Sequence, residues 1–286
     1  MTNKDTPVGF VGLGTMGSRM AANLQKNGYK LVVNDLRRES SEPFIAKGAV
    51  WAETPVAVAE QAEVFFTSLP EPNDVEAAVL GSNGLVEGVK RGAAYFDLST
   101  NSPAMVKRLF AAFEAKGAHM FDAPVNGGPR GAETGKLAIW VGGDERVFNR
   151  HKPVLDAIGD QARYIGGIGM ATVAKLVHNM SGYAAVCVFA ETFSMGVKAG
   201  MDPLDLWQAV RQGAGGRRLT FDGLLDQFLP GKYDPPAFTL RLAHKDVALA
   251  NALGRELGMP MRMCNLAYAE MTEALARGWV IATRAP

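Results

Sequence analysis

The sequence predicts an α/β domain built on a parallel sheet, followed by a domain made only of helices. Up to residue 165, short runs rich in β-branched and aromatic residues alternate with helical stretches. Beyond that point helical periodicity continues without strand signals. A glycine-rich turn also joins the first expected strand to the first expected helix. We therefore expect domains at residues 1–165 and 166–286.

The expected strands are apolar throughout, because helices cover both faces of a buried parallel sheet. They lie in "GFV", "KLVVN", "EVFFTSL", "AYFDLS", "HMFDA", "LAIWVGG" and "ARYIG". In the second half, the proline-free stretch from Met170 to Gly200 predicts one helix of about 30 residues. Further helices are expected in "DPLDLWQAVRQG", "LTFDGLLDQFL", "FTLRLAHKDVALANALGREL" and "CNLAYAEMTEALARG".

Composition excludes several classes of protein. The 30 Lys and Arg residues nearly balance 29 Asp and Glu, so no basic surface favours nucleic acid. The N-terminal "MTNKDTPVGF" lacks the apolar core of a signal peptide, and we expect no run long enough to span a membrane. Cys187 and Cys264 are too few for a disulfide framework. The cysteines, histidines and methionines show no metal-ligand spacing, so no metal is expected. These features predict a cytoplasmic protein.

The glycine-rich turn fits the dinucleotide-binding pattern G-x-G-x-x-G. Gly12, Gly14 and Gly17 follow the first strand and open a helix, and Asp35 ends the second strand about 20 positions later. In this pattern the glycines allow a tight turn, backbone approach to a pyrophosphate, and close helix–strand contact. The alternative is a turn that only packs strand against helix. We expect the turn residues to contact a dinucleotide: Gly12, Leu13, Gly14, Thr15, Met16 and Gly17.

Asp35 also bears on the choice between NAD and NADP. A carboxylate at this position can accept hydrogen bonds from both ribose hydroxyls of NAD and repels a 2′-phosphate. Arg37 and Arg38, which follow it, could attract that phosphate instead. We expect NAD as the cofactor, with NADP the less favoured alternative.

Four stretches together resemble the β-hydroxyacid dehydrogenases, the family that includes 3-hydroxyisobutyrate dehydrogenase and tartronate semialdehyde reductase. They are "GFVGLGTMGSRMAANL", "DAPVNGGPRGAETGKLAIWVGG", "GIGMATVAKLVHN" and "FTLRLAHKDVALA", and the match spans nearly the whole chain. The resemblance implies a Rossmann-type N-terminal domain, an all-helical C-terminal domain and an active site in the cleft between them. It also implies hydride transfer between a nicotinamide and a small β-hydroxy acid.

The resemblance places the acid–base group at Lys175 and a supporting asparagine at Asn179, one helical turn later. Without it, Lys175 would be taken as a solvated lysine on a helix edge. The turn at Asn126, Gly127 and Gly128 is expected to bind substrate, the glycine amides taking a carboxylate. The alternative is an ordinary strand-ending turn.

Further cofactor contacts are expected at Leu69, Pro70 and Thr100, which follow strands of the sheet. By resemblance, Lys245 approaches the nicotinamide and Asp246 fixes the local helix geometry; otherwise this pair reads as a solvated charged face. A long apolar helix that the other helices cannot cover predicts a homodimer or homotetramer.

Three positions depart from the family's usual pattern, and they leave the substrate open. Asn126 stands where serine is usual, Ala171 where glycine is common, and His178 where a second asparagine is common. Substrate candidates are 3-hydroxyisobutyrate, glycerate or tartronate semialdehyde, threonate, and 3-hydroxy amino acids such as serine or threonine. Two other functions remain open: an imine reductase of the same architecture, and a catalytically silent NAD-binding module.

Overall fold

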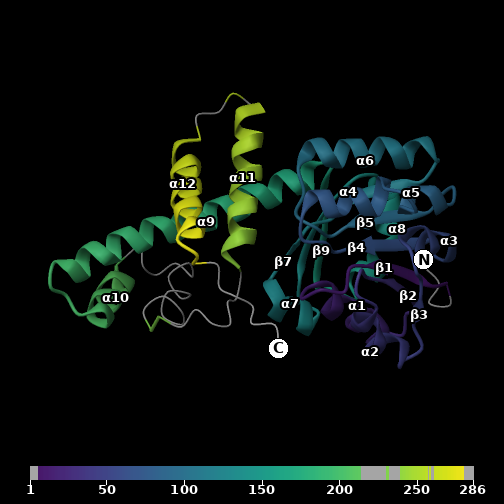
Figure 1. Cartoon of the computed structure of the whole chain (residues 1–286), viewed down its shortest axis with the longest axis horizontal. Helices are drawn as coiled ribbons and strands as arrows, with labels where there is room; N and C mark the ends of the chain where they lie inside the picture. The colour runs from purple at the N-terminus through teal and green to yellow at the C-terminus, as the bar shows by residue number, and fades with distance from the viewer. Residues whose placement is uncertain (1–5, 214–229, 232–238, 257, 259–260, 280–286) are drawn as a thin grey trace. The chain divides into compact units, whose positions relative to one another are not determined.

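The computed structural model divides into two compact units, residues 1–175 and 176–286. We call them the sheet domain and the helical domain and describe each separately (Figure 1). The structure describes residues 6–213, 230–231, 239–256, 258 and 261–279. The helix expected in "LTFDGLLDQFL" lies outside these residues. The observed division falls inside a long helix, whereas the predicted boundary at residue 165 precedes that helix.

The sheet domain is built on a nine-stranded sheet in the order β3-β2-β1-β4-β5-β6-β8-β7, with β9 paired to β8. The strands are β1 (Val8–Val11), β2 (Leu31–Asn34), β3 (Val50–Trp51), β4 (Val64–Thr67), β5 (Ala94–Asp97), β6 (His119–Asp122), β7 (Val125–Asn126), β8 (Ala138–Gly142) and β9 (Gln161–Gly166). All the expected strands are present, and the two-residue strands β3 and β7 are additional. They are too short to leave a pattern in the sequence.

Strands β1 to β6 pair with one another in parallel. The sequence predicts this direction for all of them except β3, which it does not predict. Strand β8, in contrast, runs antiparallel to both β6 and β7. The expectation of a parallel sheet was therefore wrong for "LAIWVGG". The short connection from β7 through helix α7 (Gly128–Thr134) reverses the chain instead of crossing over the sheet.

Helices cover both faces of the sheet. One core layer joins the sheet to α1 (Gly17–Lys26) and α8 (Glu145–Leu155), and the other joins it to α3 (Pro55–Gln61), α4 (Pro72–Leu80) and α6 (Pro103–Ala115). Figure 1 shows α4 and α6 on one side of the strands and α1 on the other. The remaining elements of this domain are η1 (Arg38–Ser41), α2 (Glu42–Ile45) and α5 (Leu85–Gly88). Burial on both faces explains why the strands are apolar throughout.

The helical domain packs the long helix α9 (Met170–Lys198) with α10 (Pro203–Gln212), α11 (Leu240–Glu256) and α12 (Arg262–Ala276). The first turns of α9, up to Lys175, belong to the sheet domain, and the rest of α9 belongs to the helical domain. A core cluster joins Leu176 of α9 to Val247 of α11 and Ala267 of α12. A second joins Phe193 of α9 to Leu206 of α10. The predicted long helix is thus confirmed.

One stretch of α9, Met170–Ala190, has the length and apolar composition of a membrane span among the described residues. The expectation that no such run exists was wrong on these two criteria. The stretch contains Lys175, whose ammonium group is hydrogen-bonded within the sheet domain. Because that contact packs the start of the stretch against folded protein, its composition alone is weak evidence for a membrane span.

Candidate active site

The glycine turn after β1 has the backbone that only glycine provides easily. Gly12 has a φ of +94°, and a Cβ there would lie 2.5 Å from the Ser68 carbonyl oxygen. A Cβ on Gly17 would collide with the Gly12 carbonyl oxygen, so helix and turn are in direct contact. A Cβ on Gly14 would meet nothing within 4 Å. The turn is therefore packed tightly at Gly12 and Gly17 and open at Gly14, where a pyrophosphate could approach.

The predicted cofactor residues of the sheet domain gather at the carboxyl ends of neighbouring strands. The sheet order reverses at β1, which lies between β2 and β4, and such switch points bind ligands in α/β sheets. Asp35 follows β2, and its Oδ2 accepts a hydrogen bond from the Leu13 amide at 2.7 Å. Leu69 follows β4, and its amide donates to Ser99 Oγ at 3.0 Å, next to Thr100.

Individual positions in the turn differ in what they offer a ligand. The Leu13 side chain is buried in the sheet core, so only its main chain faces the turn. Met16 precedes α1 and packs partly against the same core. Thr15 and Pro70 are exposed, and Thr100 is half-buried. The side chain of Thr15 is therefore better placed for a ligand than that of Leu13.

A buried polar network beneath these loops went unnoticed in the sequence. Asp97, 1% exposed, ends β5 and accepts hydrogen bonds from Thr67 Oγ1 at 2.9 Å, the Ser99 amide at 3.0 Å and Asn101 Nδ2 at 3.0 Å. Burial raises the pKa of Asp97, and the donors from Asn101, Ser99 and Thr67 act in the opposite direction. The network links the loops after β4 and β5. A carboxylate closing an apolar strand was its only signal in the sequence.

Lys175 and Asn126 meet in the sheet domain, although 49 positions separate them. The Lys175 Nζ donates to Asn126 Oδ1 at 2.8 Å and to the Val125 carbonyl oxygen at 2.9 Å. Lys175 comes from the first turns of α9, and its two acceptors belong to β7. The Nδ2 of Asn126 is buried and has no hydrogen-bond partner among the described residues. Two hydrogen bonds therefore hold the Lys175 amine in place, and the NH2 group of Asn126 is a donor without an acceptor among the described residues.

The predicted carboxylate-binding glycines follow β7 directly. Gly127 has a φ of +121° and Gly128 a φ of +58°, and both are exposed. Helix α7 begins here and is tied to the cofactor helix α1, because Asn23 Nδ2 donates to the Ala132 carbonyl oxygen at 2.6 Å. Asn23 is a second residue that sequence reasoning missed: a buried asparagine in an amphipathic helix carries no distinctive pattern.

The remaining predicted residues belong to the helical domain. Asn179 Nδ2 donates to Asp246 Oδ2 at 2.6 Å, and Lys245 Nζ pairs with Asp246 Oδ1 at 2.9 Å. The Tyr183 hydroxyl donates to the same carboxylate at 3.4 Å. Burial and the nearby charge of Asp246 raise the pKa of Tyr183. The structure thus gathers Asn179 and Lys245 around Asp246, and their roles toward substrate and nicotinamide stay predictions.

Ala171 and His178, two of the positions that depart from the family's usual pattern, differ in burial. Ala171 is fully buried in the first turn of α9, whereas His178 is exposed. In the part of the chain that the structure describes, no group of three His, Cys, Asp or Glu residues could hold a metal ion.

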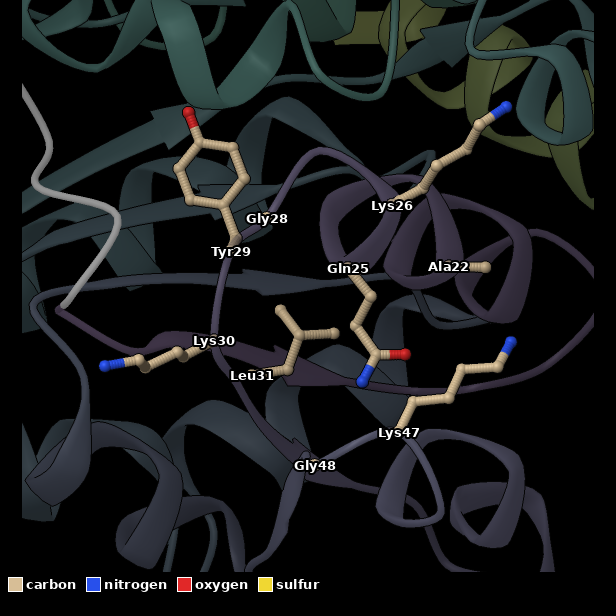
Figure 2. A pocket seen from close by; sticks show the side chains of 9 residues that line it. All are labelled: Ala22, Gln25, Lys26, Gly28, Tyr29, Lys30, Leu31, Lys47 and Gly48. Carbon is tan, nitrogen blue, oxygen red and sulfur yellow. The ribbon is translucent and has the colours of Figure 1, made fainter.

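A separate pocket of about 310 Å³ lies at the opposite end of the strands. Its lining comes from the end of α1, the start of β2 and the turn after α2, and includes Lys26, Lys30 and Lys47 (Figure 2). Because this pocket adjoins the amino end of β2, it is distinct from the turn that follows the carboxyl end of β1. It holds none of the predicted site residues.

Comparison with known proteins identifies the family. Residues 7–166 match the family model of the NAD binding domain of 6-phosphogluconate dehydrogenase. Residues 169–280 match the model described as NAD-binding of NADP-dependent 3-hydroxyisobutyrate dehydrogenase. The chain is 34% identical over 264 residues to 2-(hydroxymethyl)glutarate dehydrogenase of Eubacterium barkeri, covering 92% of this chain and 87% of that protein. The chain belongs to the β-hydroxyacid dehydrogenase family.

Solved structures agree with this membership. The 3-hydroxyisobutyrate dehydrogenase of Mycobacterium tuberculosis, solved with L-serine, matches with a TM-score of 0.84 at 26% identity, covering 95% of this chain and 94% of that one. Psf3, solved with NADP+ and 2-OPP, matches with a TM-score of 0.82 at 28% identity, covering 94% of each chain. As a β-hydroxyacid dehydrogenase, the protein is an NAD(P)-dependent oxidoreductase. The open backbone at Gly14 and the carboxylate of Asp35 fit such a dinucleotide.

Proposed function

We propose that this dehydrogenase oxidises the hydroxyl group of a small 3-hydroxy acid, or reduces the corresponding carbonyl, with Lys175 as the acid–base group. The observation that carries the proposal is the pair of hydrogen bonds from Lys175 Nζ to Val125 and Asn126. A bound nicotinamide would supply the hydride acceptor for the carbon that bears the hydroxyl. The residues of this chain must then remove the hydroxyl proton and hold the substrate.

The two acceptors orient the Lys175 amine. A neutral amine has two N–H bonds and one lone pair, and the Val125 and Asn126 oxygens take the two N–H bonds. The lone pair of the neutral amine accepts the proton of the substrate hydroxyl. An unperturbed lysine has a pKa near 10.4, and a positively charged nicotinamide nearby would favour the neutral amine. In the reductive direction the ammonium group returns the proton.

We further propose that Asn126 discriminates between substrates. Its Oδ1 is committed to Lys175, so its Nδ2 is the group left to donate to a substrate oxygen. The exposed main chain at Gly127 and Gly128 would take the substrate carboxylate. The candidates are 3-hydroxyisobutyrate, glycerate or tartronate semialdehyde, threonate, and serine or threonine. Assays of these compounds with NAD+ and NADP+ would identify the substrate by the absorbance of the reduced cofactor.

We propose NAD as the preferred cofactor. Asp35 lies where a 2′-phosphate would be repelled, and Arg38 is paired with Glu53 at 3.3 Å. The Arg37 Nε lies 3.9 Å from Asp35 Oδ1, so this arginine is also drawn toward a carboxylate. A higher kcat/KM with NADP+ than with NAD+ would contradict the proposal.

We also propose a cytoplasmic homodimer or homotetramer. The apolar side chains of Val177, Val186 and Val188 on α9 are 60%, 46% and 37% exposed in the single chain. A second copy would remove such side chains from water. Sedimentation as a monomer of 30.6 kDa at micromolar concentration would contradict the oligomer.

The experiment that tests the function is the substitution Lys175→Ala. We expect kcat to fall by about 10² to 10⁴, the usual size of acid–base catalysis, while NAD affinity stays within a few-fold of the wild type. Lys175→Arg should also fail, because a guanidinium stays protonated at neutral pH. Turnover is followed by absorbance and NAD binding by calorimetry. Lys152→Ala, which removes an exposed lysine paired with Asp156, is the matched control.

Retention of more than about a tenth of wild-type kcat/KM by Lys175→Ala would reject Lys175 as the acid–base group. Absence of turnover with every candidate substrate in the wild-type protein, together with tight NAD binding, would favour the silent binding module instead. Turnover of imines but not of hydroxy acids would favour the imine reductase.

A further inference from the structure

Asp122 ties the start of α9 to the end of β6. Its side chain is 1% exposed, and its carboxylate accepts hydrogen bonds from the Gly169 amide at 2.8 Å and the Thr172 amide at 2.6 Å. The first amides of a helix have no acceptor within the helix. A carboxylate is favourable at this end because it also faces the positive end of the helix dipole. Asp122 therefore caps α9 from 47 and 50 positions away in the sequence.

The surroundings of this carboxylate leave it little freedom. A Cβ on Gly142 of β8 would collide with Asp122 Oδ1 and would lie 2.8 Å from the Gly167 carbonyl oxygen. Burial raises the pKa of Asp122, while the Gly169 amide, the Thr172 amide and the Thr172 side chain act in the opposite direction. Gly142 thus provides the space in which the carboxylate reaches both amides.

The cap formed by Asp122 lies close in sequence to Lys175 on α9 and to the two residues that accept the hydrogen bonds of Lys175. Along α9, Lys175 follows Thr172 by three residues, about one turn. Along the other segment, Val125 and Asn126 follow Asp122 by three and four residues, and they accept the hydrogen bonds of Lys175. The same two segments are therefore joined twice, once by the Asp122 carboxylate and once by the Lys175 amine.

We infer that Asp122 is a positioning residue, which fixes the first turn of α9 so that Lys175 Nζ reaches its two acceptors and the substrate hydroxyl. The inference rests on the proposed function of Lys175. A lysine side chain is long and flexible, so the place of its nitrogen depends on where the main chain is held. A displacement of about 1 Å from a distant change can reduce turnover about 10²-fold.

The test is Asp122→Asn in the full-length protein. An amide keeps one acceptor but turns its NH2 group toward the other main-chain amide, so one hydrogen bond is lost. We expect kcat to fall about 10- to 100-fold, with the NAD dissociation constant within about 3-fold of the wild type. Hydrogen exchange followed by mass spectrometry should show faster exchange in the peptide covering Gly169 to Lys175.

The double variant Asp122→Asn/Lys175→Ala separates positioning from general damage. If Asp122 acts through Lys175, the double variant should be no slower than Lys175→Ala, measured at high enzyme concentration. The inference would be overturned if the kcat of the double variant were lower than that of Lys175→Ala by the same factor that Asp122→Asn causes in the wild type. A kcat of Asp122→Asn within about 3-fold of the wild type would also overturn it.

Asp144→Asn is the matched control. Asp144 is exposed, caps α8 of the same domain and accepts hydrogen bonds from the Arg146 and Val147 amides at 2.9 and 3.0 Å, so it is a carboxylate cap away from Lys175. Its kcat should stay within about 2-fold of the wild type, because loss of a cap alters stability rather than chemistry. An equal loss of kcat in both variants would overturn the inference.

Should Asp122→Asn fail to fold, Thr172→Val provides a milder variant. It removes the hydroxyl that contacts Asp122 and keeps the size of the side chain and the carboxylate. We expect kcat to fall about 2- to 5-fold, because the two main-chain amides still hold the carboxylate, and no further fall in the Lys175→Ala background. An unchanged kcat would count against the inference. An active Lys175→Ala would overturn the proposed function itself, whereas an inactive Lys175→Ala beside an active Asp122→Asn would overturn only the role of Asp122.

Discussion

Asp122 of the sheet domain and Asp246 of the helical domain are equally buried carboxylates that hold different kinds of partner. Asp122, 1% exposed, accepts from main-chain amides at the start of a helix. Asp246, 2% exposed, accepts from the side chain of Asn179 and forms an ion pair with Lys245. Asp122 therefore fixes the main chain at the start of α9, and Asp246 balances the positive charge of Lys245.

The difference determines what each residue controls. Main-chain amides carry no net charge, so loss of the Asp122 charge leaves no unbalanced ion behind. The Lys245 side chain, 14% exposed, is a charged partner of Asp246. Removing one member of a buried pair is costly because the other charge stays buried. We therefore expect Asp246 to govern stability more strongly than Asp122, which governs the placement of Lys175.

The largest expected effect is that of Asp246→Asn. It removes the negative charge from the buried ion pair with Lys245 and should lower the free energy of unfolding by about 3 to 5 kcal/mol. Urea denaturation of the full-length protein measures this loss. Glu273→Gln is the control in the same domain, since Glu273 pairs with Arg277 but is 57% exposed, and it should cost no more than about 1 kcal/mol. Equal losses in the two variants would show that burial does not distinguish these carboxylates.

A second comparison between the domains concerns their histidines. Burial lowers the pKa of His151 from 6.5 to about 4, while His244 is less buried and its pKa is lowered for the same reason. The folded state keeps His151 neutral, whereas the unfolded chain binds a proton below pH 6.5. The stability contributed by neutral His151 is therefore complete above pH 6.5 and is lost as pH falls toward 4.

His151→Phe should remove part of this acid sensitivity, because phenylalanine does not titrate and can pack beside Phe96. Melting temperatures recorded from pH 7.5 to 4 should fall less steeply in this variant than in the wild type. His244→Gln should change the slope less, since that ring is more exposed. A parallel decline in His151→Phe and the wild type would place the acid sensitivity elsewhere.

The smallest expected effect concerns an exposed carboxylate, Glu53, which is 74% exposed in its pair with Arg38. Glu53→Gln should change the free energy of unfolding by no more than about 1 kcal/mol. It should release Arg38 for a 2′-phosphate and raise the ratio of kcat/KM for NADP+ to that for NAD+ by up to about 5-fold, the equivalent of such a pair. Glu60→Gln, on an exposed position of α3, is the control. A ratio that does not move would mean that Arg38 does not reach the phosphate.

The sequence by itself determined the features that depend on neighbouring residues. The cofactor turn could be predicted because Gly12, Gly14 and Gly17 lie within six residues, and their conformational needs are local. The same holds for the parallel strands β1, β2, β4, β5 and β6, whose apolar runs indicate burial on both faces of the sheet. The long helix α9 could also be predicted from local sequence, since an uninterrupted stretch without proline indicates a helix whatever its distant partners are.

The tertiary structure decided which distant groups meet. Nothing in the residues around Asp122 indicates that its carboxylate accepts from Gly169 and Thr172, because a main-chain donor has no side-chain identity to read. The family resemblance singled out Lys175 and Asn126, but only the fold brings the amine within 2.8 Å of the amide oxygen. The reversal of β8 is of the same kind. Strand direction depends on how the connection folds back, and an apolar run is compatible with either direction.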